Sequence, residues 1–67
     1  MVGTKATITT KDRVSTYYLD MMSDAKHDIC KDEITIHANL NYDTALVIFK
    51  NIAEANGVSI NFDKDFL

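Results

Sequence analysis

The stretch VSTYYLDMMSDAKHDI, residues 14–29, decides the fold predicted for this chain. Its apolar residues recur at i, i+3, i+4 and i+7, the spacing that places side chains on one face of a helix. The members of this face are Val14, Tyr17, Tyr18, Met21, Met22, Ala25 and Ile29. Asp12 precedes them as a candidate N-cap, so the pattern predicts a helix over about residues 12–28.

Outside this stretch, three segments alternate between apolar and polar residues and predict strands. They are residues 5–9, 33–40 and 58–63. Between the last two segments, Asn41 can cap a second helix that ends at Gly57, the residue type preferred just past a helix end. The expected buried face of this helix consists of Tyr42, Ala45, Leu46, Phe49, Ile52 and Ala53.

The predicted order is β-α-β-α-β, a small two-layer α+β fold. Right-handed crossovers predict a parallel three-stranded sheet of order 1-2-3 with both helices on one face, whereas order 2-1-3 would place one helix on each face. Parallel sheets are rarely uncovered on one side. The polar face therefore either meets a partner or is tolerated in water. Its candidate interface residues are Thr35, His37, Asn39, Ser59 and Asn61.

Length and composition limit the class of protein. A chain of 67 residues forms a single domain of marginal stability, and its lone Cys30 cannot form an intramolecular disulfide, which favours oligomerisation or binding to a partner. The net charge of −3 argues against direct nucleic-acid binding. No apolar run is long enough to cross a bilayer and no secretory h-region is present, so a cytoplasmic location is expected.

The segment AKHDICKDE, residues 25–33, brings His27 and Cys30 close in sequence and could form a metal or thiol site. On a helix the two side chains could share a face, but no further cysteine or histidine cluster supplies the remaining ligands. A structural interpretation explains more of the segment, because His27 suits a helix C-terminus while Ile29 and Cys30 would fill the core. No catalytic residue, metal ligand or cofactor is predicted.

Three aspartates, Asp20, Asp24 and Asp28, lie four residues apart and would form one ridge along the first predicted helix. Like charges at this spacing cost about 0.2–0.5 kcal/mol per pair, so a helix selected for stability alone would rarely contain them. The ridge is either an ordinary solvated face or an electrostatic docking surface for a basic partner. Leu19 falls outside the apolar stripe of this helix and is expected to be exposed beside the ridge.

These observations predict a non-enzymatic, acidic protein-binding module that acts as an inhibitor or accessory factor on a basic, nucleic-acid-binding surface of a larger protein. A phage or mobile-element origin would suit such a chain. The predicted partner-binding residues are Asp12, Leu19, Asp20, Asp24, Asp28 and Asp32. The alternatives are a homodimer or larger assembly that pairs through a sheet edge or the open polar face, and a metal or thiol site at His27 and Cys30.

Overall fold

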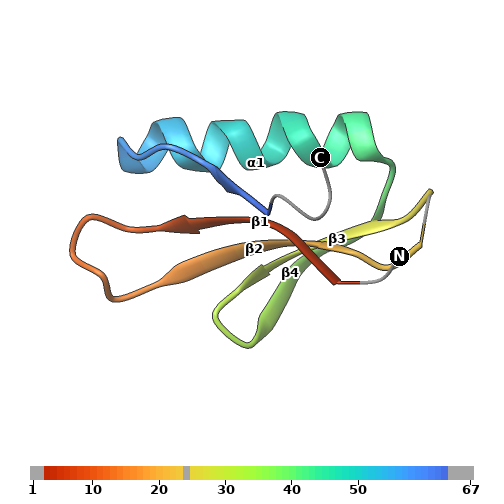
Figure 1. Cartoon of the computed structure of the whole chain (residues 1–67), viewed down its shortest axis with the longest axis horizontal. Helices are drawn as coiled ribbons and strands as arrows, with labels where there is room; N and C mark the ends of the chain where they lie inside the picture. The colour runs from red at the N-terminus through yellow and green to blue at the C-terminus, as the bar shows by residue number, and fades with distance from the viewer. Residues whose placement is uncertain (1–2, 24, 64–67) are drawn as a thin grey trace.

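The computed structural model describes residues 3–23 and 25–63, which form an antiparallel sheet covered on one face by a helix (Figure 1). The elements in chain order are β1 (Gly3–Thr9), β2 (Thr16–Met21), β3 (His27–Lys31), β4 (Ile34–Leu40), α1 (Tyr42–Asn56) and β5 (Asn61–Phe62). The strand order across the sheet is β4-β3-β2-β1-β5. The first four strands are joined by hairpins, and α1 crosses the sheet before β5 pairs with β1.

The predicted parallel β-α-β-α-β fold with two helices is wrong, because residues 16–21 and 27–31 form the antiparallel strands β2 and β3 and not a helix. The helical spacing conceals a second period in this stretch: Tyr17, Leu19 and Met21 alternate along β2 and lie on the helix side of the sheet. The chain turns between Met22 and Lys26, where the Met22 N–H donates to the Lys26 carbonyl at 2.9 Å. Because hairpins join neighbouring strands directly, the sheet is antiparallel.

The second predicted helix is confirmed as α1, with both of its predicted ends. The Asn41 side chain accepts a hydrogen bond from the Thr44 N–H at 2.8 Å, which satisfies a donor that the first helical turn leaves open. At the other end Gly57 adopts a left-handed conformation with φ of 65°, and the Val58 N–H reaches the Ala53 carbonyl at 3.0 Å. The predicted strands at residues 5–9 and 33–40 correspond to β1 and β4, whereas only Asn61–Phe62 of the third segment forms a strand.

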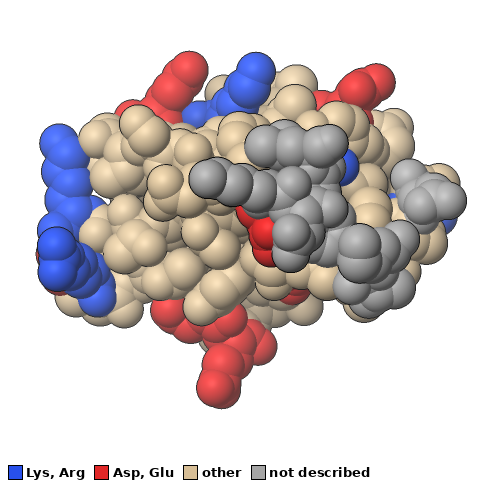
Figure 2. Space-filling model, viewed as in Figure 1, with Lys and Arg blue, Asp and Glu red and all other residues tan. Residues whose placement is uncertain are grey.

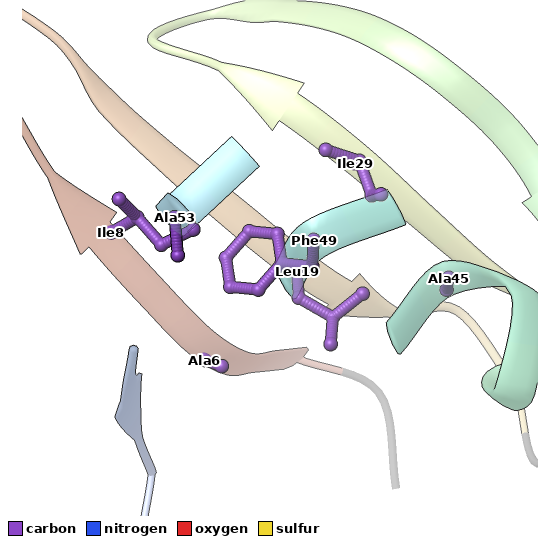
Figure 3. Packing of buried hydrophobic residues seen from close by; sticks show 7 residues of the cluster. All are labelled: Ala6, Ile8, Leu19, Ile29, Ala45, Phe49 and Ala53. Atoms are coloured by element: carbon purple, nitrogen blue, oxygen red, sulfur yellow. The ribbon is translucent and has the colours of Figure 1, made fainter. Parts of the chain in front are cut away.

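The hydrophobic core lies between α1 and the central strands. Phe49 of α1 is fully buried and is flanked along the helix by Ala45 and Ala53 (Figure 3). The sheet contributes Ala6 and Ile8 from β1, Leu19 from β2 and Ile29 from β3. The prediction that Leu19 is an exposed partner-binding residue is therefore wrong, since its exposed fraction is 0%. Tertiary packing against these few strands stabilises α1, whose length alone would make it marginal in water.

The two edges of the sheet differ. β5 has only two residues, whereas β4 has seven and carries no Asp, Glu, Lys or Arg. β4 is irregular: the pairing register with β3 shifts twice, between His27 and Ile29 and between Ile29 and Cys30. In the part of the chain that is described, no helix is long and apolar enough to span a membrane.

Candidate protein-binding face

The face of the sheet opposite α1 is the candidate functional surface. Side chains alternate across a strand, so the neighbours of the core residues point to this face. We call it the open sheet face and define it by Thr4, Thr7, Thr9, Thr16, Tyr18, Asp20, Asp28, Cys30, Thr35 and Asn61. Among residues 3–23 and 25–63 no helix covers it (Figure 1).

Two carboxylates face each other at the centre of this surface. Asp20 of β2 and Asp28 of β3 are direct cross-strand partners, and both are half-buried. Like charges placed opposite each other destabilise a sheet, by up to about 1 kcal/mol for a pair of this kind. Within residues 3–23 and 25–63, no lysine or arginine forms an ion pair with either carboxylate. The sheet therefore carries a pair of negative charges that the fold does not neutralise.

Hydrogen bonds fix these carboxylates in place without removing their charge. The Thr4 hydroxyl donates to Asp20 Oδ1 at 2.9 Å, and the Cys30 thiol donates to Asp20 Oδ2 at 3.6 Å. Thr35 continues the row, with its Oγ1 3.6 Å from the Cys30 Sγ. Four strands thus contribute one side chain each to a row that crosses the sheet. Asp28 is fixed separately, because its Oδ1 accepts the Asn39 N–H at 3.1 Å.

Four of the described cations belong to other parts of the molecule. Lys5 and Lys31 lie over the rings of Tyr42 and Tyr17, which are on the helix side of the sheet. Lys11 and Arg13 belong to the β1–β2 loop, and Figure 2 shows basic side chains gathered at that end of the molecule. Acidic side chains project at the bottom of the same view, below the β3–β4 hairpin (Figures 1 and 2).

The predicted aspartate ridge along a helix does not form, but Asp20 and Asp28 are brought together in another way. Residues whose numbers add to 48 pair in the β2–β3 hairpin, for example Leu19 with Ile29 and Asp20 with Asp28. Equal spacing on either side of the turn therefore places these two acids opposite each other. Asp24, the third predicted member, lies outside the described residues.

Two other predicted partner-binding acids have structural roles. Asp12 is not a helix N-cap but stabilises the β1–β2 loop, where its Oδ1 accepts the Thr10 hydroxyl at 2.6 Å and the Val14 N–H at 3.0 Å. The hydrogen bond from Thr10 is the main cause of the lowered pKa of Asp12. Asp32 extends the β2–β3 pairing, because its Oδ1 accepts the Thr16 N–H at 3.1 Å and its own N–H donates to the Thr16 carbonyl at 2.8 Å.

The five residues predicted to share an open polar sheet face are dispersed. Thr35 and Asn61 do lie on the open sheet face, but on β4 and β5, at opposite edges of the sheet. His37 pairs with Ile29, a core residue on the helix side. Asn39 adopts a positive φ of 58°, and Ser59 lies in the connection before β5. No common surface of these five residues is formed.

The predicted alternative of a site at His27 and Cys30 required a helix. In β3 the two residues lie on opposite faces, since His27 is buried beneath α1 while Cys30 faces the open side. In the described residues no three His, Cys, Asp or Glu side chains are grouped so that they could hold a metal ion. Burial raises the pKa of the Cys30 thiol, and the nearby Asp20 and Asp28 act in the same direction, so Cys30 is a poor nucleophile at neutral pH.

Thr4 and Tyr18 belong to this surface but were not among the site residues predicted from the sequence. Tyr18 is half-buried between its cross-strand partners Thr7 and Cys30. The alternation of apolar and polar residues in TYYLDM, residues 16–21, is the signal that could have placed Tyr18 and Asp20 on one face.

Comparisons of the chain with protein-family models, with curated proteins and with solved structures found no match.

Proposed function

We propose that this protein is a non-enzymatic, cytoplasmic binding module that docks on a larger protein through the open sheet face. Asp20 and Asp28 would contact lysine or arginine side chains of a basic surface, such as a nucleic-acid-binding groove, and the protein would act there as an inhibitor or accessory factor. The observation that carries this proposal is the Asp20–Asp28 pair, which is opposed across two strands and has no cation beside it among the described residues.

Binding of a cationic side chain would relieve the repulsion between Asp20 and Asp28. Repulsion between the two carboxylates costs stability in the free protein, and a guanidinium group placed against them would convert that repulsion into attraction. The hydrogen bonds from Thr4 and Cys30 hold Asp20 in position before binding. Less side-chain entropy would therefore be lost when a partner docks. Tyr18, two residues before Asp20 on the same face, offers a ring on which a guanidinium could also stack.

Affinity capture with matched baits tests this proposal. The immobilised wild-type protein, the Asp20→Asn/Asp28→Asn double variant and an Asp43→Asn control are each exposed to host lysate, and proteins retained by the wild type are purified for affinity measurement. The double variant is expected to bind the purified partner at least tenfold more weakly, a loss of about 1.4 kcal/mol. The Asp43→Asn control removes a charge from the first turn of α1, away from the open sheet face, and is expected to bind as the wild type does.

Two further measurements define the chemistry of the contact. Wild-type binding is expected to weaken steeply as salt rises, because charge–charge contacts are screened, and duplex DNA is expected to compete if the partner's site binds nucleic acid. Equal affinity of the wild type and the double variant would refute the proposal.

A second candidate function, self-assembly, is favoured by the β4 edge. This strand has no charged residue, and Ile34 and Ile36 are 69% and 39% exposed. An edge of this composition can pair with a strand of a second copy, although the two register irregularities in β4 oppose such pairing.

Sedimentation equilibrium up to about 500 µM distinguishes this candidate. Ile34→Lys is expected to abolish any self-association, whereas Val47→Lys, at a 60% exposed position of α1, makes the same chemical change away from the edge. A wild-type protein that stays monomeric, or an equal effect of the two variants, rules out assembly through β4.

A further inference from the structure

His27 is the one buried polar side chain of the described core, with an exposed fraction of 1%. It lies at the start of β3, on the helix side of the sheet. Neither its Nδ1 nor its Nε2 has a hydrogen-bond partner. Most buried polar side-chain groups are hydrogen-bonded, and each exception calls for an explanation. The acidic open sheet face, on the other side of β3, does not use this residue.

The surroundings of His27 disfavour its protonated form. Its ring packs against the ring of Tyr42, with 5.3 Å between the centroids. The ammonium group of Lys5 lies 4.0 Å from the centroid of the same tyrosine ring. A second cation at His27 would therefore lie near Lys5, with its N–H groups buried and only the backbone of Leu40 favouring the charge.

The position of Tyr42 adds to this effect. Tyr42 is the first residue of α1, directly after the Asn41 N-cap, and the N-terminus of a helix carries a partial positive charge. The flanking strands supply Met21 from β2 and Leu40 from β4 as the register partners of His27, and neither side chain is ionisable. Lys5 is the charged group that acts on His27 in the described part of the chain.

We propose that His27 is a proton-sensitive latch: as the neutral imidazole it holds the first turn of α1 against β3, and protonation releases that turn. Burial lowers the pKa of His27, and Lys5 lowers it further, which agrees with this geometry. Release would expose the ring of His27 and separate Tyr42 from Lys5. The proposal is independent of docking through Asp20 and Asp28, so either can fail alone.

The sign of the pH effect follows from linkage. Because the pKa of His27 is lower in the folded protein than the ordinary value of 6.5, the unfolded or opened state binds the proton more readily. The contribution of His27 to stability is therefore complete above about pH 6.5. It decreases as the pH falls below that value toward the pKa of the folded state. Carboxylates titrate mainly at lower pH, so the interval from pH 8 to pH 5 isolates the histidines.

The chain provides its own control, since His37 is exposed on β4. Urea unfolding between pH 8 and pH 5 is measured for the wild type, for His27→Phe and for His37→Gln. The urea midpoint of the wild type is expected to fall with pH; His27→Phe should remove at least half of that fall, and His37→Gln should leave it unchanged. Equal pH profiles for the wild type and His27→Phe would overturn the proposal.

Amide hydrogen exchange in the wild-type protein tests the local character of the latch and needs no variant, should His27→Phe fail to fold. After correction for intrinsic exchange rates, lowering the pH from 7.5 to 5.5 is expected to reduce protection at Leu46 and Val47, whose N–H groups bond within the first turns of α1, at least fivefold more than at Leu19 in β2. An equal loss at both places would mean global destabilisation and would refute a latch. Imidazole NMR signals that show His27 gaining its proton above the ordinary histidine value of about 6.5 would refute it as well.

Discussion

Removing the charge of Asp20 is expected to leave the stability of the isolated protein nearly unchanged, in contrast to most substitutions at half-buried positions. Asp20 and Asp28 oppose each other directly on β2 and β3, and Asp20→Asn removes the charge–charge repulsion between them. Two unit charges about 6 Å apart repel by about 0.7 kcal/mol in water, and by more where solvent is partly excluded. Both residues are half-buried, so this value is a lower estimate of the repulsion.

The opposing term is the hydrogen bond from the Thr4 hydroxyl to Asp20 Oδ1, which loses its charge assistance in Asp20→Asn. This loss is about 0.5–1 kcal/mol, so the two effects nearly cancel in the unfolding free energy of the single variant. A double-mutant cycle separates the two terms, because each single variant carries its own hydrogen-bond loss. The cycle of Asp20→Asn, Asp28→Asn and the double variant is expected to give a coupling free energy of about 0.7 kcal/mol. The first substitution already removes the whole charge–charge repulsion, so the second one cannot remove it again.

Urea denaturation at 50 mM and 1 M NaCl is the assay. The coupling is expected to shrink at 1 M NaCl, where the screening length is about 3 Å. A parallel cycle of Asp20→Asn with Asp43→Asn should be additive, and Asp43→Asn alone should destabilise, by about 0.3–1 kcal/mol, because its carboxylate lies in the first turn of α1. A coupling near zero, or one indifferent to salt, would refute the claim that the acid pair costs stability.

Three further predictions concern the fold and the thiol. Phe49→Ala is expected to lower the free energy of unfolding by about 3–5 kcal/mol, because Phe49 is fully buried in the core. In a domain with so small a core this loss would leave most molecules unfolded, which circular dichroism at 25 °C would reveal as loss of the folded signal. Asn41→Ala should lower the unfolding free energy by about 1 kcal/mol through loss of the cap to Thr44, and Asn41→Ser should restore most of it; no difference between the two would contradict the cap's role. Cys30 is expected to react with iodoacetamide more slowly in the folded than in the urea-unfolded chain at pH 7.5, because burial raises the pKa of its thiol. Mass spectrometry of timed samples measures the two rates, and an equal or faster reaction of the folded chain would contradict the prediction.

Much of the second half of the chain could be predicted from the sequence. The N-cap at Asn41, the apolar spacing through Phe49 and the glycine at position 57 all indicate the same helix, and α1 begins and ends where they predict. Alternation likewise indicated the strand at residues 33–40. Local signals sufficed in these segments because the capping residue, the apolar spacing and the glycine at the helix end are consistent with one another.

The first half could not be assigned by the same reasoning. In residues 14–29, adjacent apolar pairs such as Tyr17–Tyr18 and Met21–Met22 satisfy a helical period while the alternation through Leu19 satisfies a strand period. Tertiary packing decides between them, since only the hairpin buries Leu19 and Ile29 against Phe49. The same ambiguity affected the site: Asp20 and Asp28, which are eight residues apart, would lie on one ridge of a helix but are cross-strand partners in the hairpin.

The most direct test of the central claim is an NMR titration of the ¹⁵N-labelled protein with a short oligoarginine peptide at 50 mM NaCl. Docking through the open sheet face predicts that the largest amide shift changes occur at Tyr18–Asp20 and Asp28–Cys30, and that they are lost in Asp20→Asn/Asp28→Asn. Larger changes around Asp43 and Glu54 of α1, or the same changes in the double variant, would contradict it.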